Sequence, residues 1–188
     1  MAKFETAEAI TGRNEGGYAN NLADTGGETY AGIARNHWPS WAGWKIIDQI
    51  KNAYGRSASV INRQAKLNPT LQKMISDFYK INFWNANKLD MFTDQQLANS
   101  VYDFAVNSGN DRSAKFLQQA ANDTGLVNLV VDGGIGNKTI AAINALSGLN
   151  VYTNFNRRRE VFYRSIAKGS QAQFLKSWLS RLKPYKNC

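Results

Sequence analysis

Apolar residues recur every three or four positions along most of the chain, and this spacing constrains the fold more than any other feature of the sequence. Such spacing is typical of helices that bury one face. It predicts a mainly α protein with little strand. The stripes are Phe4, Ala7 and Ile10; Trp41, Trp44, Ile47 and Ile50; Leu71, Met74, Ile75 and Phe78; Leu97, Val101, Phe104 and Ala105; Ala114, Leu117 and Ala121, with Asp111 as the expected N-cap; Phe155, Phe162 and Ile166; and Phe174, Leu175, Trp178 and Leu182.

Two glycine-rich segments interrupt this helical pattern. Gly16 and Gly17 predict that the first helix ends at Glu15. The following stretch, YANNLADTGGETYAGI over 18–33, is rich in Gly, Asn and Thr and predicts a loop or a short hairpin. The second segment, VVDGGIGNKT, lacks the GKT of a P-loop and the ligand ladder of a calcium loop, so we expect a turn that opens onto a helix.

The length of 188 residues suits one compact domain or two small lobes that share a core. No internal repeat and no low-complexity linker divides the chain. The best candidate boundary lies near Phe92, Thr93 and Asp94. We therefore predict two regions, 1–93 and 94–188, packed together as one compact unit.

Composition removes several classes of enzyme. His37 is the only histidine and Cys188, the last residue, the only cysteine, which excludes an HExxH metalloenzyme, a multi-cysteine metal site and an internal disulfide. Carboxylates remain as the candidates for catalysis. The 23 Lys and Arg against 14 Asp and Glu give a net charge of +9, which favours an anionic partner such as nucleic acid, a membrane surface or cell wall.

The hydropathy of the chain and its N-terminal sequence can be searched for a membrane span and a secretory signal. No stretch approaches the roughly 20 consecutive apolar residues of a membrane span. The N-terminal sequence MAKFETAEAI places Glu5 and Glu8 where a secretory signal would be uninterruptedly apolar. We therefore expect no cleavable signal peptide, and an extracellular target would require another export route.

Glu15 is the strongest candidate for acid catalysis. At the end of a helix, the negative end of the helix dipole is expected to raise the pKa of its carboxyl, which suits a general acid. Gly16 and Gly17 leave room for a bulky substrate to approach. The alternative is a solvated glutamate that precedes an ordinary glycine cap.

The order of motifs around Glu15 resembles glycoside hydrolase family 108. EGGY, followed by D-x-GG-x-T-x-x-GI, is similar to the catalytic region of these N-acetylmuramidases, which occur in phage endolysins and in bacterial proteins, some labelled secretion activators. DFAVNSGNDRSAKFLQQA and VDGGIGNKTIAAIN resemble the peptidoglycan-binding region that accompanies the family. NRRREVFYRSI and FLKSWLSR resemble its end, so the similarity covers most of the chain.

The resemblance implies roles for individual residues. It places the family's general acid on Glu15, which would protonate the glycosidic oxygen. The order Glu, Asp, Thr is also similar to phage-type lysozymes, which implies that Asp24 orients water or stabilises the oxocarbenium ion beside Thr29. Thr29 follows Asp24 by five positions, one fewer than in those lysozymes. Asp24 in an Asx-turn is the alternative, and Glu28 is a rival second carboxylate whose expected role is a solvated surface residue.

Other residues are candidates for substrate binding or for the core. Tyr18 and Tyr30, with Gly16 and Gly17, would line a saccharide cleft, although either tyrosine could belong to the core. Trp38, Trp41 and Trp44 have the spacing of a core face.

Two further sets of polar residues stand later in the chain. Asp103 and Asn107 either support the cleft or serve capping and packing. Arg157, Arg158 and Arg159, with Arg164 and Lys168, form a basic cluster that we expect to be a solvated face, with a wall-facing patch as the alternative.

The resemblance implies a mainly α, lysozyme-like fold and a peptidoglycan hydrolase. The expected reaction cleaves the β-1,4 bond between N-acetylmuramic acid and N-acetylglucosamine without a metal or organic cofactor. The expected partner is a peptidoglycan glycan strand bound by a monomer, with no nucleic acid and no membrane insertion. Action in the periplasm or outside the cell would follow export from the cytoplasm, for example through a holin.

Alternatives to this function stay open. A lytic transglycosylase would use one glutamate as acid and base. A non-catalytic peptidoglycan-binding or secretion-assisting protein would keep the wall affinity alone. Nucleic-acid binding rests only on charge. The identity of the second carboxylate, an inverting or retaining course, and a phage or a bacterial role also stay open.

Overall fold

The computed structural model describes residues 1–11, 16–20 and 26–186. The chain divides into two compact units, which are described separately. The hairpin unit comprises Glu8–Ile81, and the bundle unit comprises Met1–Ala7 together with Asn82–Cys188. The first unit is thus inserted between two pieces of the second. The predicted division into functional regions 1–93 and 94–188 stays a prediction.

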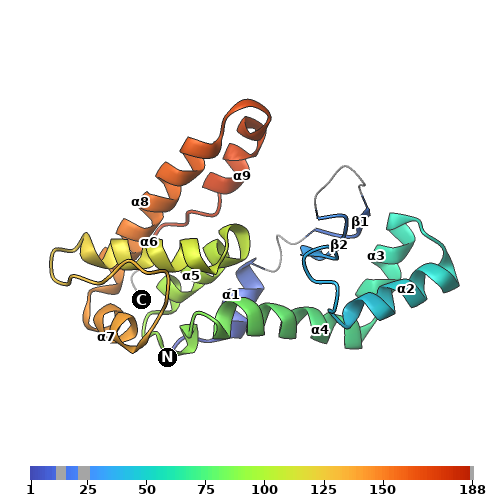
Figure 1. Cartoon of the computed structure of the whole chain (residues 1–188), viewed down its shortest axis with the longest axis horizontal. Helices are drawn as coiled ribbons and strands as arrows, with labels where there is room; N and C mark the ends of the chain where they lie inside the picture. The colour runs from blue at the N-terminus through green and yellow to red at the C-terminus, as the bar shows by residue number, and fades with distance from the viewer. Residues whose placement is uncertain (12–15, 21–25, 187–188) are drawn as a thin grey trace. The chain divides into compact units, whose positions relative to one another are not determined.

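The hairpin unit combines a small antiparallel sheet with three helices (Figure 1). The strand order is β1-β2-β3, with Ala19 opposite Thr29 and Tyr30 opposite Ile33. The predicted short hairpin after the first helix is therefore confirmed. The elements are β1 (Ala19–Asn20), β2 (Glu28–Tyr30), β3 (Ile33–Ala34), α2 (Gly43–Tyr54), α3 (Ala58–Lys66) and α4 (Pro69–Tyr79).

Helix α4 shows how the sequence sets an element boundary in this unit. The Asn68 side chain accepts a hydrogen bond of 2.9 Å from the Leu71 amide. Pro69 occupies the first helical turn, where its missing N–H costs nothing. Leu71 and Phe78 are buried, as their spacing predicts.

The predicted tryptophan core face is only partly correct. Trp44, on α2, is buried, but Trp41 is half-buried and Trp38 is 39% exposed. Helix α2 begins at Gly43, so the other two tryptophans precede it and do not follow its periodicity. Their rings instead pack edge-on against Phe78, at centroid distances of 4.8 and 6.2 Å.

The bundle unit is helical in its described residues. Helices α5, α6 and α8 pack on one another and enclose a core that includes Phe104 and Phe155 (Figure 1). Asp94 caps α5 by accepting a 2.8 Å hydrogen bond from the Leu97 amide. The elements are α1 (Phe4–Thr11), whose first residues belong here, the π-helical segment η2 (Lys80–Asn85), the 3-10 segment η3 (Leu89–Met91), α5 (Gln95–Ser108), α6 (Asn110–Asn122), α7 (Asn137–Ala145), α8 (Gly148–Ile166), the 3-10 segment η4 (Gly169–Phe174) and α9 (Leu175–Leu179).

Three details of the sequence interpretation change. Helix α6 begins at Asn110, directly after Gly109 with φ of 88°, so Asp111 lies in its first turn and pairs with Lys115 instead of capping the helix. The last predicted stripe is divided among η4, α9 and the segment after α9, which holds Leu182, and Phe174 is exposed. The described part of the first helix reaches Thr11, and its predicted end at Glu15 lies outside the described residues.

The predicted fold class is confirmed. The described chain is mainly α, with one short sheet that follows the first helix. Among the described residues, no helix combines the length and apolar character that crossing a membrane requires.

Candidate functional site

The predicted acid Glu15 and the predicted second carboxylate Asp24 lie outside the described residues. The structure does describe segment 16–20, which directly follows Glu15, and segment 26–30, which begins two positions after Asp24. Both segments belong to the hairpin unit. The candidate site is therefore built from these flanking residues and from the side chains that hold them.

Tyr18 is held at both its backbone and its side chain. Its amide donates a 2.7 Å hydrogen bond to Oδ1 of Asn62, on α3. Its phenol donates a 2.8 Å hydrogen bond to Oε1 of Glu28, on β2. A Cβ on Gly17 would lie 2.7 Å from the Asn62 amide, so this close approach requires glycine, whereas no atom of the described residues lies within 4 Å of a Cβ built on Gly16. The chain three residues beyond Glu15 is thus fixed in place.

Glu28 is a partly buried ionic centre, so its predicted role as a solvated surface residue is wrong. Lys51 Nζ lies 2.6 Å from Oε1, and Arg35 Nε lies 2.9 Å from Oε2. The Glu28 side chain is only 11% exposed. Alternation along β2 explains this position, because residues 28 and 30 share a strand face and Tyr30 is buried.

Asp48, on α2, completes this group, which we call the Glu28 cluster: Glu28, Arg35, Asp48 and Lys51. Asp48 Oδ1 lies 2.9 Å from Arg35 Nη2 and 2.6 Å from Lys51 Nζ. Partial burial works against the charged carboxylate, but hydrogen bonds from Arg35 and Lys51 outweigh it and lower the pKa of Asp48. The guanidinium of Arg35 also lies over the Trp44 ring, 4.6 Å from its centroid. Two cations and two carboxylates balance in the cluster.

The two predicted substrate tyrosines differ. Burial, followed by the hydrogen bond to Glu28, raises the pKa of Tyr18 to about 12, and its side chain is half-buried. Tyr30 is buried, and burial raises the pKa of its phenol, so the structure favours the core alternative for this residue. Thr29 is half-buried on the opposite face of β2, and its hydroxyl donates a long 3.4 Å hydrogen bond to the Gly27 carbonyl.

Asp103 and Asn107 make contacts within the bundle unit, which favours the packing alternative for these two residues. Asp103 is buried and pairs with Arg159 and Arg181. Asn107 Nδ2 donates a 2.6 Å hydrogen bond to the Asp103 carbonyl. The predicted solvated face is wrong for Arg159, which is 1% exposed, because it lies on the core side of α8.

Two further candidates for ligand binding are the glycine-rich segment near Asp132 and a metal site. The glycine-rich segment near Asp132 is a turn, as predicted, in which Asp132 Oδ1 accepts hydrogen bonds from the Gly134 amide and from Gln118 Nε2. Within residues 1–11, 16–20 and 26–186, no three His, Cys, Asp or Glu side chains come together as a metal site would require.

Sequence reasoning missed the residues that hold the candidate site, namely Arg35, Asp48, Lys51 and Asn62. Asn62 lies 44 positions from the Tyr18 amide that it binds, and Lys51 lies 23 positions from Glu28. No local pattern marks such pairs. Only the strand alternation at Glu28 offered a signal.

Two family models match the chain and define its class. The model of the family described as Glycosyl hydrolase 108 matches residues 9–109, more than half of the chain, and the model of a Predicted Peptidoglycan domain matches residues 112–183. The chain belongs to the glycosyl hydrolase 108 family. Comparison with curated proteins gave no match.

Among solved structures, the chain is similar to SagA of Brucella abortus. The two share 26% sequence identity with a TM-score of 0.63, over 95% of this chain and 88% of that one. The two family matches together show a protein that acts on peptidoglycan. Domains of this kind indicate action outside the cytoplasm. The border between the matches falls between α5 and α6, which both belong to the bundle unit.

Proposed function

We propose that the protein is an N-acetylmuramidase that hydrolyses the β-1,4 bond between N-acetylmuramic acid and N-acetylglucosamine. The observation that carries this proposal is the match to the glycosyl hydrolase family over residues 9–109, which include both the EGGY and the D-x-GG-x-T motifs. The double anchoring of Tyr18, just beyond Glu15, supports it, because a catalytic acid acts only when its position is fixed.

In the proposed reaction, Glu15 donates a proton to the glycosidic oxygen as the bond to the sugar breaks. Asp24 either orients the attacking water or stabilises the oxocarbenium ion, with the Thr29 hydroxyl beside it. Gly16, where no atom of the described residues lies within 4 Å of the Cβ position, leaves an approach for the glycan. The half-buried ring of Tyr18 offers an apolar face against which a sugar ring can pack.

Glu28 is assigned a positioning role in this proposal. Tyr18 and Lys51 occupy Oε1, and Arg35 lies against Oε2. A carboxylate engaged in this way is poorly placed to activate water. It instead ties the segment after Glu15 to the strand after Asp24, which favours Asp24 as the second catalytic carboxylate.

The first test is Glu15→Gln, which deletes the acid proton at nearly constant side-chain volume. Loss of a general acid costs roughly 10²–10⁴ in rate, measured as the turbidity decrease of purified peptidoglycan. Glu5→Gln, on α1, is the matched control and should lyse normally. Retention of more than about a tenth of the wild-type rate would exclude Glu15 as the acid.

The second carboxylate is tested by Asp24→Asn against Glu28→Gln. We expect Asp24→Asn to lower the rate by less than Glu15→Gln does, at unchanged free energy of unfolding. Glu28→Gln should lower stability and activity together. A silent Asp24→Asn beside a crippled but fully stable Glu28→Gln would transfer the catalytic role to Glu28.

Product analysis separates the alternative reactions. Hydrolysis leaves reducing ends on the released fragments, whereas a lytic transglycosylase leaves anhydro-muramic ends. The match of residues 112–183 to a peptidoglycan domain favours one second candidate, a protein that binds the wall without cutting it. Wild-type protein that pellets with walls but releases no fragments would establish that candidate.

A further inference from the structure

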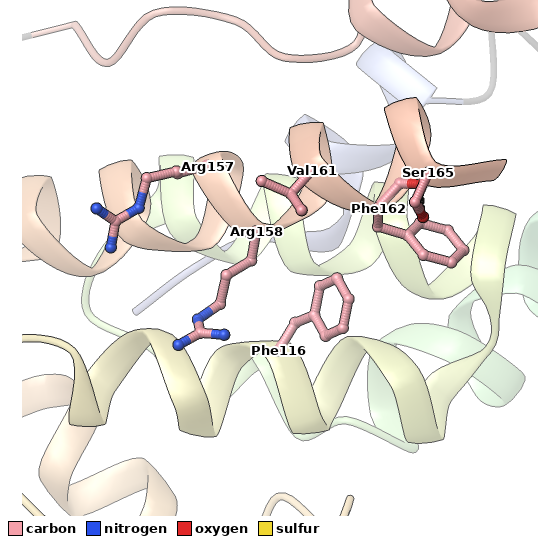
Figure 2. A pocket seen from close by; sticks show the side chains of 6 residues that line it. All are labelled: Phe116, Arg157, Arg158, Val161, Phe162 and Ser165. Atoms are coloured by element: carbon pink, nitrogen blue, oxygen red, sulfur yellow. Dashed lines mark hydrogen bonds between the residues drawn. The ribbon is translucent and has the colours of Figure 1, made fainter. Parts of the chain in front are cut away.

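A groove lies between α6 and α8 in the bundle unit, far along the chain from the proposed catalytic residues. Its volume is about 440 Å³. Phe116 of α6 faces Val161 and Phe162 of α8 across it, with Arg157 and Arg158 toward one end and Ser165 toward the other (Figure 2). Neither the fold nor the proposed hydrolysis accounts for this surface.

The apolar wall of the groove packs against the core of the bundle unit. Phe162 packs edge-on against Phe116 and against the fully buried Phe104, at centroid distances of 5.9 and 5.8 Å. The guanidinium of Arg112 lies 4.7 Å from the Phe162 centroid. Beside this wall, Val161 is 65% exposed. The groove thus presents an ordered apolar surface to solvent, and such surfaces often mark binding sites.

The two arginines at the charged end of the groove differ in how closely they pair with Asp123. Arg158 is bound by both oxygens of Asp123, at 2.7 and 2.6 Å, and these hydrogen bonds lower the pKa of Asp123. Arg157 approaches the same carboxylate only at 3.6 Å, and its side chain is 66% exposed. One carboxylate therefore faces two guanidinium groups, so the end of the groove keeps a positive charge and Arg157 keeps donors for an anion.

The polar groups of the groove match a carboxylate better than a sugar. Sugar hydroxyls require acceptors as well as donors, but guanidinium groups only donate. The Ser165 hydroxyl, the other polar side chain in the lining, already donates a 2.7 Å hydrogen bond to the Phe162 carbonyl. A ligand that suits this lining carries a carboxylate and small apolar groups. In peptidoglycan, the short peptides attached to the glycan have this chemistry, with free carboxylates and alanine methyl groups.

We propose that the α6–α8 groove binds the peptide stem of peptidoglycan, with a stem carboxylate on Arg157 and its methyl groups against Val161 and Phe162. The proposal extends the family match of residues 112–183 by naming a site and the part of the polymer that it takes. It does not require that Glu15 be catalytic.

The test measures binding of a synthetic stem pentapeptide without sugar to the full chain by isothermal titration calorimetry. The wild-type protein should bind this peptide. Arg157→Gln should weaken binding by about tenfold or more, because a hydrogen bond to a charged group is lost. Val161→Glu should weaken peptide binding as well, since it places a negative charge, the same as that of the stem carboxylate, on the apolar wall.

Arg164→Gln is the matched control. It removes the same charge from α8, at an exposed arginine that pairs with Glu160 and does not line the groove. Its affinity should stay within about twofold of the wild type if site-specific contacts decide binding. An equal loss in Arg157→Gln and Arg164→Gln would overturn the proposal in favour of general charge attraction.

Two further titrations identify the ligand. Peptide-free glycan strands and a polyphosphate chain are titrated under the same conditions. Binding of either one at the groove, lost in Arg157→Gln, without binding of the peptide would overturn the proposal. A failed peptide titration beside normal, Glu15-dependent lysis would refute this site and leave the proposed function intact. Peptide binding without lysis would support this site and refute the proposed hydrolysis.

Discussion

The two units each contain a cluster of charged side chains, but the clusters differ in burial and in balance. In the hairpin unit, the Glu28 cluster pairs two cations with two carboxylates, and the Asp48 side chain is 44% exposed. In the bundle unit, Asp103 lies between Arg159 and Arg181, and Arg159 is almost fully buried. We call this second group the Arg159 cluster.

Burial explains why the Arg159 cluster has more hydrogen-bond partners. Arg159 donates hydrogen bonds to Ser100 Oγ at 2.7 Å and to the Tyr163 hydroxyl at 3.2 Å, as well as to Asp103. It also lies over the Phe104 ring, at 5.2 Å. A buried charge without such partners would be costly. The Glu28 cluster is instead solvated in part, through Arg35 and Asp48, so it can lose one member at lower cost.

The largest expected loss of stability follows a substitution in the Arg159 cluster. Asp103→Asn keeps the shape of the side chain but leaves Arg159 buried without its counter-charge, which we expect to cost about 3 kcal/mol or more of the free energy of unfolding. Urea unfolding followed by circular dichroism measures it. Arg181→Gln, at the solvent side of the cluster, should cost clearly less. If both variants unfold like the wild type, burial does not govern this cluster.

A substitution in the Glu28 cluster should lower the free energy of unfolding by less. Glu28→Gln removes the charge that pairs with Lys51 and Arg35, while Asp48 continues to pair with both. We expect a cost of about 1.5–2 kcal/mol by the same measurement, at the low end of the range for hydrogen bonds to charged groups. A loss as large as that of Asp103→Asn would mean that the two clusters are equivalent.

Tyr18 makes the stability of the hairpin unit depend on pH in alkaline solution. An unfolded phenol ionises near pH 10, whereas the folded Tyr18 keeps its proton until about pH 12. Between these values the folded state binds more protons, so the free energy of unfolding should fall as pH rises from 10 toward 12. Tyr18→Phe should show a shallower fall. Tyr30 and Tyr152 titrate in both proteins, and an identical slope would contradict the raised pKa of Tyr18.

The smallest effect is expected where both partners are exposed. Lys73 and Asp77 form a 2.6 Å pair, four residues apart on α4, with both side chains largely in solvent. Lys73→Gln should change the free energy of unfolding by about 0.5 kcal/mol or less. High salt should reduce even this difference. A cost above that of Glu28→Gln would reverse the proposed order from buried to exposed.

The helices of this protein were predictable because their apolar residues repeat locally. The buried face of α5, with Leu97, Val101 and Phe104, follows directly from that repeat. The same repeat also places Arg159, since it lies four residues after Phe155 and four before Tyr163, both buried. Its charge led to a surface assignment, although its position in the periodicity indicates the core.

The candidate site was less predictable because its contacts join distant segments. EGGY indicates a catalytic region through resemblance, but Asn62, Arg35 and Lys51 lie on other elements, and only folding brings them to Tyr18 and Glu28. Charge alone could not distinguish the partly buried Glu28 from an exposed glutamate. A strand of three residues is too short for its alternation to decide the matter.

The two-piece construction of the bundle unit has a consequence for the order in which the chain folds on the ribosome. The Phe4 ring packs edge-on against Trp84 and Tyr102, at 5.8 Å in each case, and the Ala2 amide donates to the Phe92 carbonyl. Synthesis makes residues 1–7 before the hairpin unit, yet their partners emerge only after that whole unit has been made. Residues 1–7 are therefore buried late although they are made early, and the nascent chain carries Phe4 without its complete packing until Tyr102 leaves the exit tunnel.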